Sequence, residues 1–204
     1  MTRFASVLPL SAAAMADSDF IIVLDKSGSM DNPSNRFPDK TRYEELAESV
    51  TSLARKASRY DADGLTLILF SNNTIVRDSV KADAVRQAFQ ENEPGATTAL
   101  HLAIEEAGKK VRGSSKNCVI MVFTDGSPDN ETLAINAMDK LALEFGRPKI
   151  GFLFVQVGND KGAADFLKKL DSGLPSKIDV CATLTAEEAD NFSIEMLAAI
   201  AQQS

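Results

Sequence analysis

The chain has 204 residues, of which 44% are hydrophobic and 25% charged, a composition typical of one globular domain with a sizeable core. Its formal net charge of −7 argues against nucleic acid or an anionic membrane as a partner, because no dense cluster of Lys and Arg offsets the repulsion. No apolar run approaches the roughly 18 residues that a membrane-spanning helix needs. We therefore expect neither a nucleic-acid partner nor a membrane partner.

We expect residues 1–18 to form an N-terminal arm and residues 19–204 to form the domain. The arm ends near Ala14-Met15-Ala16, a string of small residues like the cleavage site of a secretory signal. Its apolar part is short and is interrupted by Pro9, so a poorly packed or strand-adding arm is favoured, with a weak signal peptide as the alternative.

The first predicted strand is residues 20–24, an apolar run typical of a buried central strand. It leads directly into Asp25, Ser27 and Ser29, which alternate along one loop. Gly28 lies between the serines and permits backbone angles that a side chain would oppose. The strand therefore delivers three oxygen-bearing side chains to the surface.

Residues 31–40 contain two prolines and predict a loop, in which Arg36 and Phe37 are candidates for partner contact; the alternative is a solvated connector. A helix begins after Thr41, which forms a capping box with Glu44. Its apolar stripe contains Leu46, Val50, Leu53 and Ala57. The charged side chains expected to face water are Glu44, Glu45, Glu48, Arg55 and Lys56.

Residues 65–70 and 74–78 predict a hairpin at the edge of the sheet, with the second strand antiparallel and half exposed. A short helix at 83–90 follows. The next helix buries Leu100, Ala103, Ile104, Ala107 and Val111, and we expect the exposed ion pairs Glu105/Lys109 and Glu106/Lys110 on it.

The rest of the chain continues the alternation of strands and helices. We expect strands at 119–124, at 150–157 and, more exposed, at 178–183, and helices from Asn130 or Asp129 to about 145, from about 160 to 170, and after Thr185. The fold class is α/β: a single doubly wound, mostly parallel sheet of about six strands with one antiparallel edge strand and helices on both faces.

The two cysteines, Cys118 and Cys181, stand in apolar, strand-like surroundings. They lack the spacing of metal ligands, and buried thiols in a reducing compartment are favoured over a disulfide. We therefore expect a cytoplasmic protein.

Ligands of such sheets bind beyond the carboxyl ends of the strands, where the strand order reverses. The first and fourth strands are the natural neighbours there, so Asp25 and Asp125 would emerge side by side together with the two serines. Thr97 or Thr98, before the helix at residue 100, can add a hydroxyl. Oxygen donors of this kind suit a hard divalent cation.

The string Asp25-x-Ser27-x-Ser29, followed by Thr97 and by Asp125 in Thr-Asp-Gly, resembles the metal-ion-dependent adhesion site (MIDAS) of the von Willebrand factor type A domain. The order of strands and helices from about residue 19 onward agrees with that Rossmann-like family. Ala96 departs from the second Gly that many relatives have, and Thr98 is the alternative to Thr97.

The resemblance implies that all five residues hold a metal, with the hydroxyls bound directly or through water and the aspartates often through water. It also implies Mg²⁺, with Mn²⁺ or Ca²⁺ as alternatives, and one coordination position free for an Asp or Glu of a protein partner. The sequence thus predicts a non-enzymatic, cation-dependent protein-binding module.

Two other functions stay open. One is a Mg²⁺-dependent phosphotransferase of the haloacid-dehalogenase type, with Asp25 as nucleophile, although that family has a second Asp where this chain has Ser27. The other is a structural domain with an inactive site. An isolated Asp-x-Ser-x-Ser string is more often a polar turn, so only the ordered combination of the three segments indicates a metal site.

Overall fold

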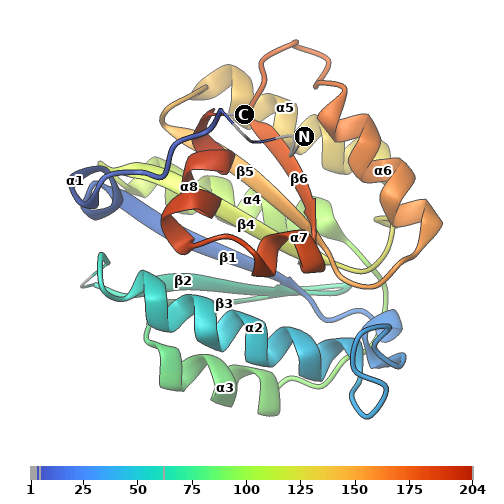
Figure 1. The fold of residues 1–204 in the computed structure, drawn as a ribbon. Helices are drawn as coiled ribbons and strands as arrows, with labels where there is room; N and C mark the ends of the chain where they lie inside the picture. The colour runs from blue at the N-terminus through green and yellow to red at the C-terminus, as the bar shows by residue number, and fades with distance from the viewer. Residues whose placement is uncertain (1–3, 5, 62, 204) are drawn as a thin grey trace.

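The computed structural model describes residues 4, 6–61 and 63–203. They contain a six-stranded sheet in the order β3-β2-β1-β4-β5-β6 (Figure 1). The pairs are parallel except for the antiparallel β2–β3 hairpin at one edge, as the sequence predicts. The strands are β1 Ser18–Asp25, β2 Leu65–Phe70, β3 Thr74–Val80, β4 Asn117–Thr124, β5 Ile150–Gln156 and β6 Cys181–Thr185.

Helices cover both faces of this sheet, which confirms the doubly wound α/β fold (Figure 1). One face carries α4 Leu100–Gly113, α5 Glu131–Glu144 and α6 Lys161–Asp171. On the other face are α1 Ala12–Ala16, α2 Arg42–Ala57, α3 Ala82–Gln90, α7 Ala186–Asp190 and α8 Ile194–Gln203. None of the helices in the described part of the chain is long and apolar enough to cross a bilayer.

Strand β1 lies at the centre and is buried on both of its faces. Ile22 and Leu24 belong to the core beneath α2 and α8, whereas Ile21 and Val23 belong to the core beneath α4 and α5. A central parallel strand needs apolar residues at every position, which explains the continuous run in the sequence. The strand is therefore fixed from both sides, and so is the loop that follows Asp25.

The N-terminal arm contacts the domain where the structure describes it. Met15 of α1 is fully buried, Phe4 packs edge-on against Phe192, and the Leu10 N–H donates to the Glu195 carbonyl at 3.1 Å. Residues 1–3 and 5 of the arm lie outside the described residues. The boundary at residue 18 stays a prediction.

The C-terminal elements differ from the expectation in two ways. Strand β6 begins at Cys181 instead of residue 178, because the chain still turns at Lys177 (φ 61°), and the strand is largely buried instead of exposed. The single helix expected after Thr185 is two helices. The capping box of Thr185 and Glu188 does form, but Ser193 accepts from the Met196 N–H and starts α8.

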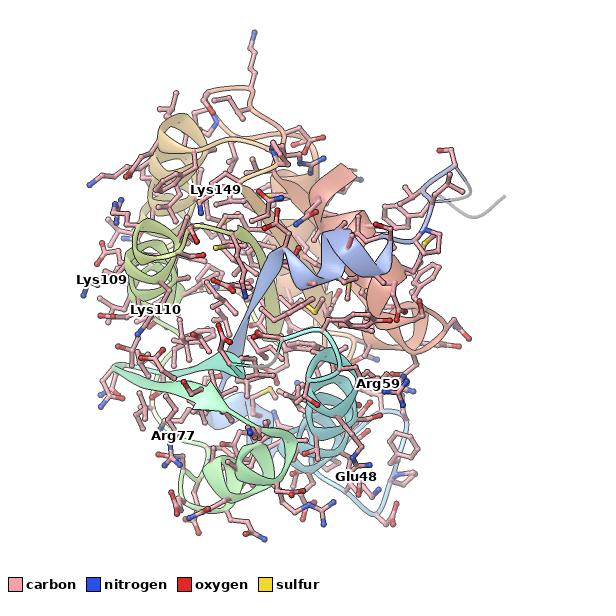
Figure 2. The ribbon with its side chains drawn as sticks, turned by 90° about the vertical axis from the view of Figure 1, so that its left-hand side faces the viewer. Glu48, Arg59, Arg77, Lys109, Lys110 and Lys149 are labelled. Atoms are coloured by element: carbon pink, nitrogen blue, oxygen red, sulfur yellow. The ribbon has the colours of Figure 1, made fainter. Side chains whose placement is uncertain are left out.

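Two expectations about charged side chains are also wrong. Glu45 is buried, because it accepts hydrogen bonds from the Ser34 hydroxyl and from Arg36. The lysines of α4 pair differently: Lys109 binds Glu106 at 2.7 Å, and Lys110 binds Asp78 at 2.6 Å. Figure 2 shows Lys110 on the side of α4 toward the β2–β3 hairpin, where Asp78 lies, and Lys109 pointing away from it.

Candidate metal centre

The candidate site lies at the carboxyl end of β1 and β4. The two strands are parallel neighbours, and Leu24 pairs with Phe123, so Asp25 and Thr124 come out of the sheet side by side. After Asp25 the chain enters the short 3₁₀ helix η1 Gly28–Asp31 (Figure 1). The reversal of strand order at β1 therefore joins the two polar strand ends in one place.

Asp25 is fully buried, and both of its carboxylate oxygens accept hydrogen bonds. Oδ1 accepts from the Ser27 N–H at 2.8 Å, and Oδ2 accepts from the Thr124 hydroxyl at 2.6 Å. Burial raises the pKa of Asp25 to about 6, and the hydrogen bonds from Thr124 and Ser27 oppose that shift. The carboxyl group is thus held in one orientation by the loop and by the neighbouring strand.

Ser27, Ser29 and Asp125 continue the polar chain. The two serine hydroxyl oxygens lie 3.1 Å apart, and Ser29 donates to Asp125 Oδ1 at 2.7 Å. A hydroxyl that donates its hydrogen to a carboxylate keeps its lone pairs for another partner. The structure therefore brings four of the five predicted ligands into one connected group with two hydroxyl oxygens side by side.

The fifth predicted ligand, Thr97, is linked to this group through the backbone of its loop. The Gly28 N–H donates to the Ala96 carbonyl at 3.1 Å, and the Gly95 N–H donates to the Lys26 carbonyl at 2.8 Å. Ala96 has a φ of 64°, a left-handed conformation that glycine adopts more easily. Within the described residues the Thr97 hydroxyl makes no hydrogen bond to the other four predicted ligands.

The two threonines of this loop differ in their surroundings. Thr97 is exposed, whereas Thr98 is only 9% exposed and its N–H donates to Asp129 Oδ2 at 3.0 Å. The Asp129 N–H returns a hydrogen bond to the Thr98 carbonyl at 3.0 Å. Asp129 therefore joins the Thr98 loop to the loop after β4, while Asn130 caps α5. The sequence predicted either Asp129 or Asn130 as the N-cap of this helix.

Arg42 is a residue of the site that the sequence reasoning missed. Its Nη1 donates to Asp125 Oδ2 at 2.6 Å, and the side chains are 13% and 0% exposed respectively. A signal for it existed: Arg42 occupies the first turn of α2, where the helix dipole disfavours a positive charge. Thr124, which stands inside the Thr-Asp-Gly string, was missed as well.

The loop at 31–40 is tied down by internal ion pairs. Arg36 binds Glu45 at 3.0 Å and also binds Asp190 of α7, and Glu45 accepts from the Ser34 hydroxyl at 2.5 Å. Of the two residues proposed for partner contact, Arg36 is thus engaged within the chain. Phe37 is 40% exposed, with the Arg36 guanidinium 5.3 Å from its ring centre.

The donor set suits a hard divalent cation. It consists of two carboxylates and three hydroxyls, the oxygen ligands preferred by Mg²⁺, Mn²⁺ and Ca²⁺, and it lacks the imidazole and thiolate groups that favour zinc. In the described part of the chain no group of three or more His, Cys, Asp or Glu side chains could hold a metal. The candidate set has only two such residues and relies on hydroxyls, so it is a different kind of site.

The doubly wound sheet with a polar loop at the switch point defines a Rossmann-like α/β fold. A sequence profile of the von Willebrand factor type A domain matches residues 20–127, which is more than half of the chain. The chain therefore belongs to the von Willebrand factor type A family. A search of curated proteins finds no match.

Three solved structures from different organisms have the same fold. The PilB minor pilin from Streptococcus sanguinis has a TM-score of 0.60 at 10% identity, over 88% of this chain and 59% of the pilin. The pilus adhesin SpaC from Lactobacillus rhamnosus GG has a TM-score of 0.62 at 14% identity, over 89% and 29%. Manganese-loaded TRAP from Plasmodium vivax has a TM-score of 0.59 at 17% identity, over 85% and 71%.

These identities show a shared fold and no more. The chain spans 59% of the length of the pilin and 29% of that of the pilus adhesin, so both of those proteins contain much that this chain does not match.

Proposed function

We propose that this chain is a protein-binding module that works through a divalent cation at a MIDAS, without catalysing a reaction. The residues that would hold the cation are Asp25, Ser27, Ser29, Thr97 and Asp125. The observation that carries the proposal is the continuous hydrogen-bonded group from Asp25 to Asp125, in which two serine hydroxyl oxygens lie 3.1 Å apart. Mg²⁺ is the expected ion, with Mn²⁺ or Ca²⁺ as alternatives.

Hydrogen bonds within the chain orient the proposed donor groups. Asp25 accepts from the Ser27 N–H and thereby orients the first loop, and Asp125 takes the hydrogen of the Ser29 hydroxyl. When bound, the cation supplies a Lewis-acidic point that attracts an acidic group. Because most of its direct ligands are neutral hydroxyls, that attraction is retained. The proposed partner is therefore a protein that presents an Asp or Glu side chain.

The proteins of the same fold and the two cysteines support the proposed role and location. Two proteins of the same fold are a minor pilin and a pilus adhesin, and a third was solved with manganese, which supports binding over catalysis. Cys118 and Cys181 are both unpaired and buried, which supports the proposed cytoplasmic location.

The rival phosphotransferase function has weaker support. It needs Asp25 as an accessible nucleophile, but Asp25 is fully buried and both of its oxygens accept hydrogen bonds. We therefore expect no metal-dependent hydrolysis of an aryl phosphate, and turnover that disappears in an Asp25→Asn variant would favour the enzyme instead.

The test of the proposal is calorimetric titration with Mn²⁺ and Mg²⁺. Ser29→Ala removes the hydroxyl between Ser27 and Asp125 without removing a charge, and Ser52→Ala, on the exposed face of α2, is the matched control. We expect binding by the natural chain and by Ser52→Ala, and at least about tenfold weaker binding by Ser29→Ala. Equal heats in all three proteins would refute the metal site. Capture of a partner from lysate that EDTA abolishes would then test the adhesive role.

A further inference from the structure

Arg42 forms a buried ion pair at the candidate metal site. Its guanidinium donates to Asp125 at 2.6 Å, and neither side chain has more than 13% of its surface exposed. Removing one partner of such a pair leaves a largely buried charge without its counter-charge. The site therefore contains a positive charge of its own, 83 residues away from Asp125 along the chain.

The guanidinium occupies only one side of the Asp125 carboxylate. Oδ2 accepts from Arg42, whereas Oδ1 accepts from Ser29, whose hydroxyl oxygen lies 3.1 Å from that of Ser27. The positive charge of Arg42 thus acts on Asp125 without covering the oxygen next to the serines. Asp125 can serve the candidate site and Arg42 at the same time.

The fold reserves space for this side chain. Gly158, with a φ of 73°, lies against Arg42, and a Cβ at that glycine would be 2.9 Å from Arg42 Nε. In the part of the chain that the structure describes, Nε is buried without a hydrogen-bond partner. The described contacts of the guanidinium thus concentrate on Asp125, as expected for a group that acts through its charge.

We propose that Arg42 sets the charge balance of the site: it weakens the binding of the divalent cation and strengthens the attraction of the loaded site for an acidic group. This inference rests on the proposed function. Asp25, Asp125 and Arg42 sum to one negative charge when ionised, so a divalent cation leaves one positive charge. Without Arg42 the same sum would be zero, and the pull on a carboxylate would fall.

The test compares Arg42→Gln, which removes the charge, with Arg42→Lys, which keeps it. The charge of Arg42 repels a cation at the same carboxylate, so we expect Arg42→Gln to bind Mn²⁺ at least about tenfold more tightly than the natural chain. We expect Arg42→Lys to stay within about threefold. Acetate binding to the Mn²⁺-saturated proteins, followed by NMR line broadening, should weaken in Arg42→Gln only.

Thermal unfolding gives a readout that does not depend on a partner. We expect Arg42→Gln to melt below the natural chain in EDTA, and saturating Mn²⁺ to reduce that difference, because the cation replaces the missing positive charge beside Asp125. If Arg42→Gln does not fold, Gly158→Ala displaces the guanidinium without removing it, and unchanged Mn²⁺ affinity in that variant would overturn the inference.

The outcomes separate this inference from the proposed function. Equal Mn²⁺ affinity in the natural chain and Arg42→Gln overturns the role of Arg42 and leaves the metal site intact. Binding by neither protein overturns both. Binding by Arg42→Gln alone overturns the metal-dependent function of the natural chain, and with it the proposed attraction of a loaded site for an acidic group.

Discussion

Replacing Thr124 by Val tests how the buried carboxyl group of Asp25 is held. The Thr124 hydroxyl donates to Asp25 Oδ2 at 2.6 Å, and Asp25 is fully buried, so water does not replace the lost donor. A hydrogen bond to a charged group contributes about 1.5–3 kcal/mol to stability. Because Val has nearly the same shape, we expect the free energy of unfolding in EDTA to fall by about that amount, measured by urea denaturation followed by circular dichroism.

The control for this substitution is Thr51→Val in α2. Thr51 is also buried, but its hydroxyl donates to the Ala47 carbonyl, which is already an acceptor in the helix. We expect a change below about 0.5 kcal/mol there, because no charged group loses a partner. If Thr124→Val behaves like this control, Asp25 does not depend on the hydroxyl, and our account of how β4 orients the first loop is incorrect.

Two further predictions concern the core. In Gly151→Ala the new Cβ would lie 2.6 Å from the carbonyl carbon of Ala201, so we expect β5 and α8 to separate and the free energy of unfolding to fall by about 1–3 kcal/mol. A Cβ at Gly113 meets open space, so Gly113→Ala should leave stability unchanged. Equal urea midpoints for the two variants would contradict this. Burial raises the pKa of the Cys118 and Cys181 thiols, so both should react slowly with Ellman's reagent at pH 8 and rapidly in urea. Fast labelling of the folded protein would show instead that the thiols are accessible.

Most of the fold could be predicted because its signals are local. The apolar run before Asp25 marks a strand buried on both faces, and the Thr41–Glu44 capping box marks the start of α2, which the structure reproduces. The last elements were less predictable. The backbone turn at Lys177 and the new helix start at Ser193 depend on short polar segments that leave no periodic pattern.

Some residues of the candidate site could also be predicted from the sequence, and others could not. Asp25 and Asp125 directly follow apolar strands, so the sheet topology alone places them together. Arg42 reaches Asp125 from the first turn of α2, and no spacing in the sequence encodes such a contact. Thr124 looked like the last residue of a strand, and its role depends on lying beside Asp25 in the sheet. Both omissions are side chains that contact the predicted ligands from another element.

The surroundings of the site limit what a partner can contact. Arg36, Glu45 and Asp190 are engaged with one another and fix the 31–40 loop to α2 and α7, so they offer little charge to a second protein. Phe37 remains exposed on this loop, and Thr97 is exposed at the candidate site. One acid bridged through a cation contributes only part of a stable interface, and apolar contacts near its centre usually add the rest. We therefore predict that a partner of the proposed module presents an apolar side chain next to its Asp or Glu.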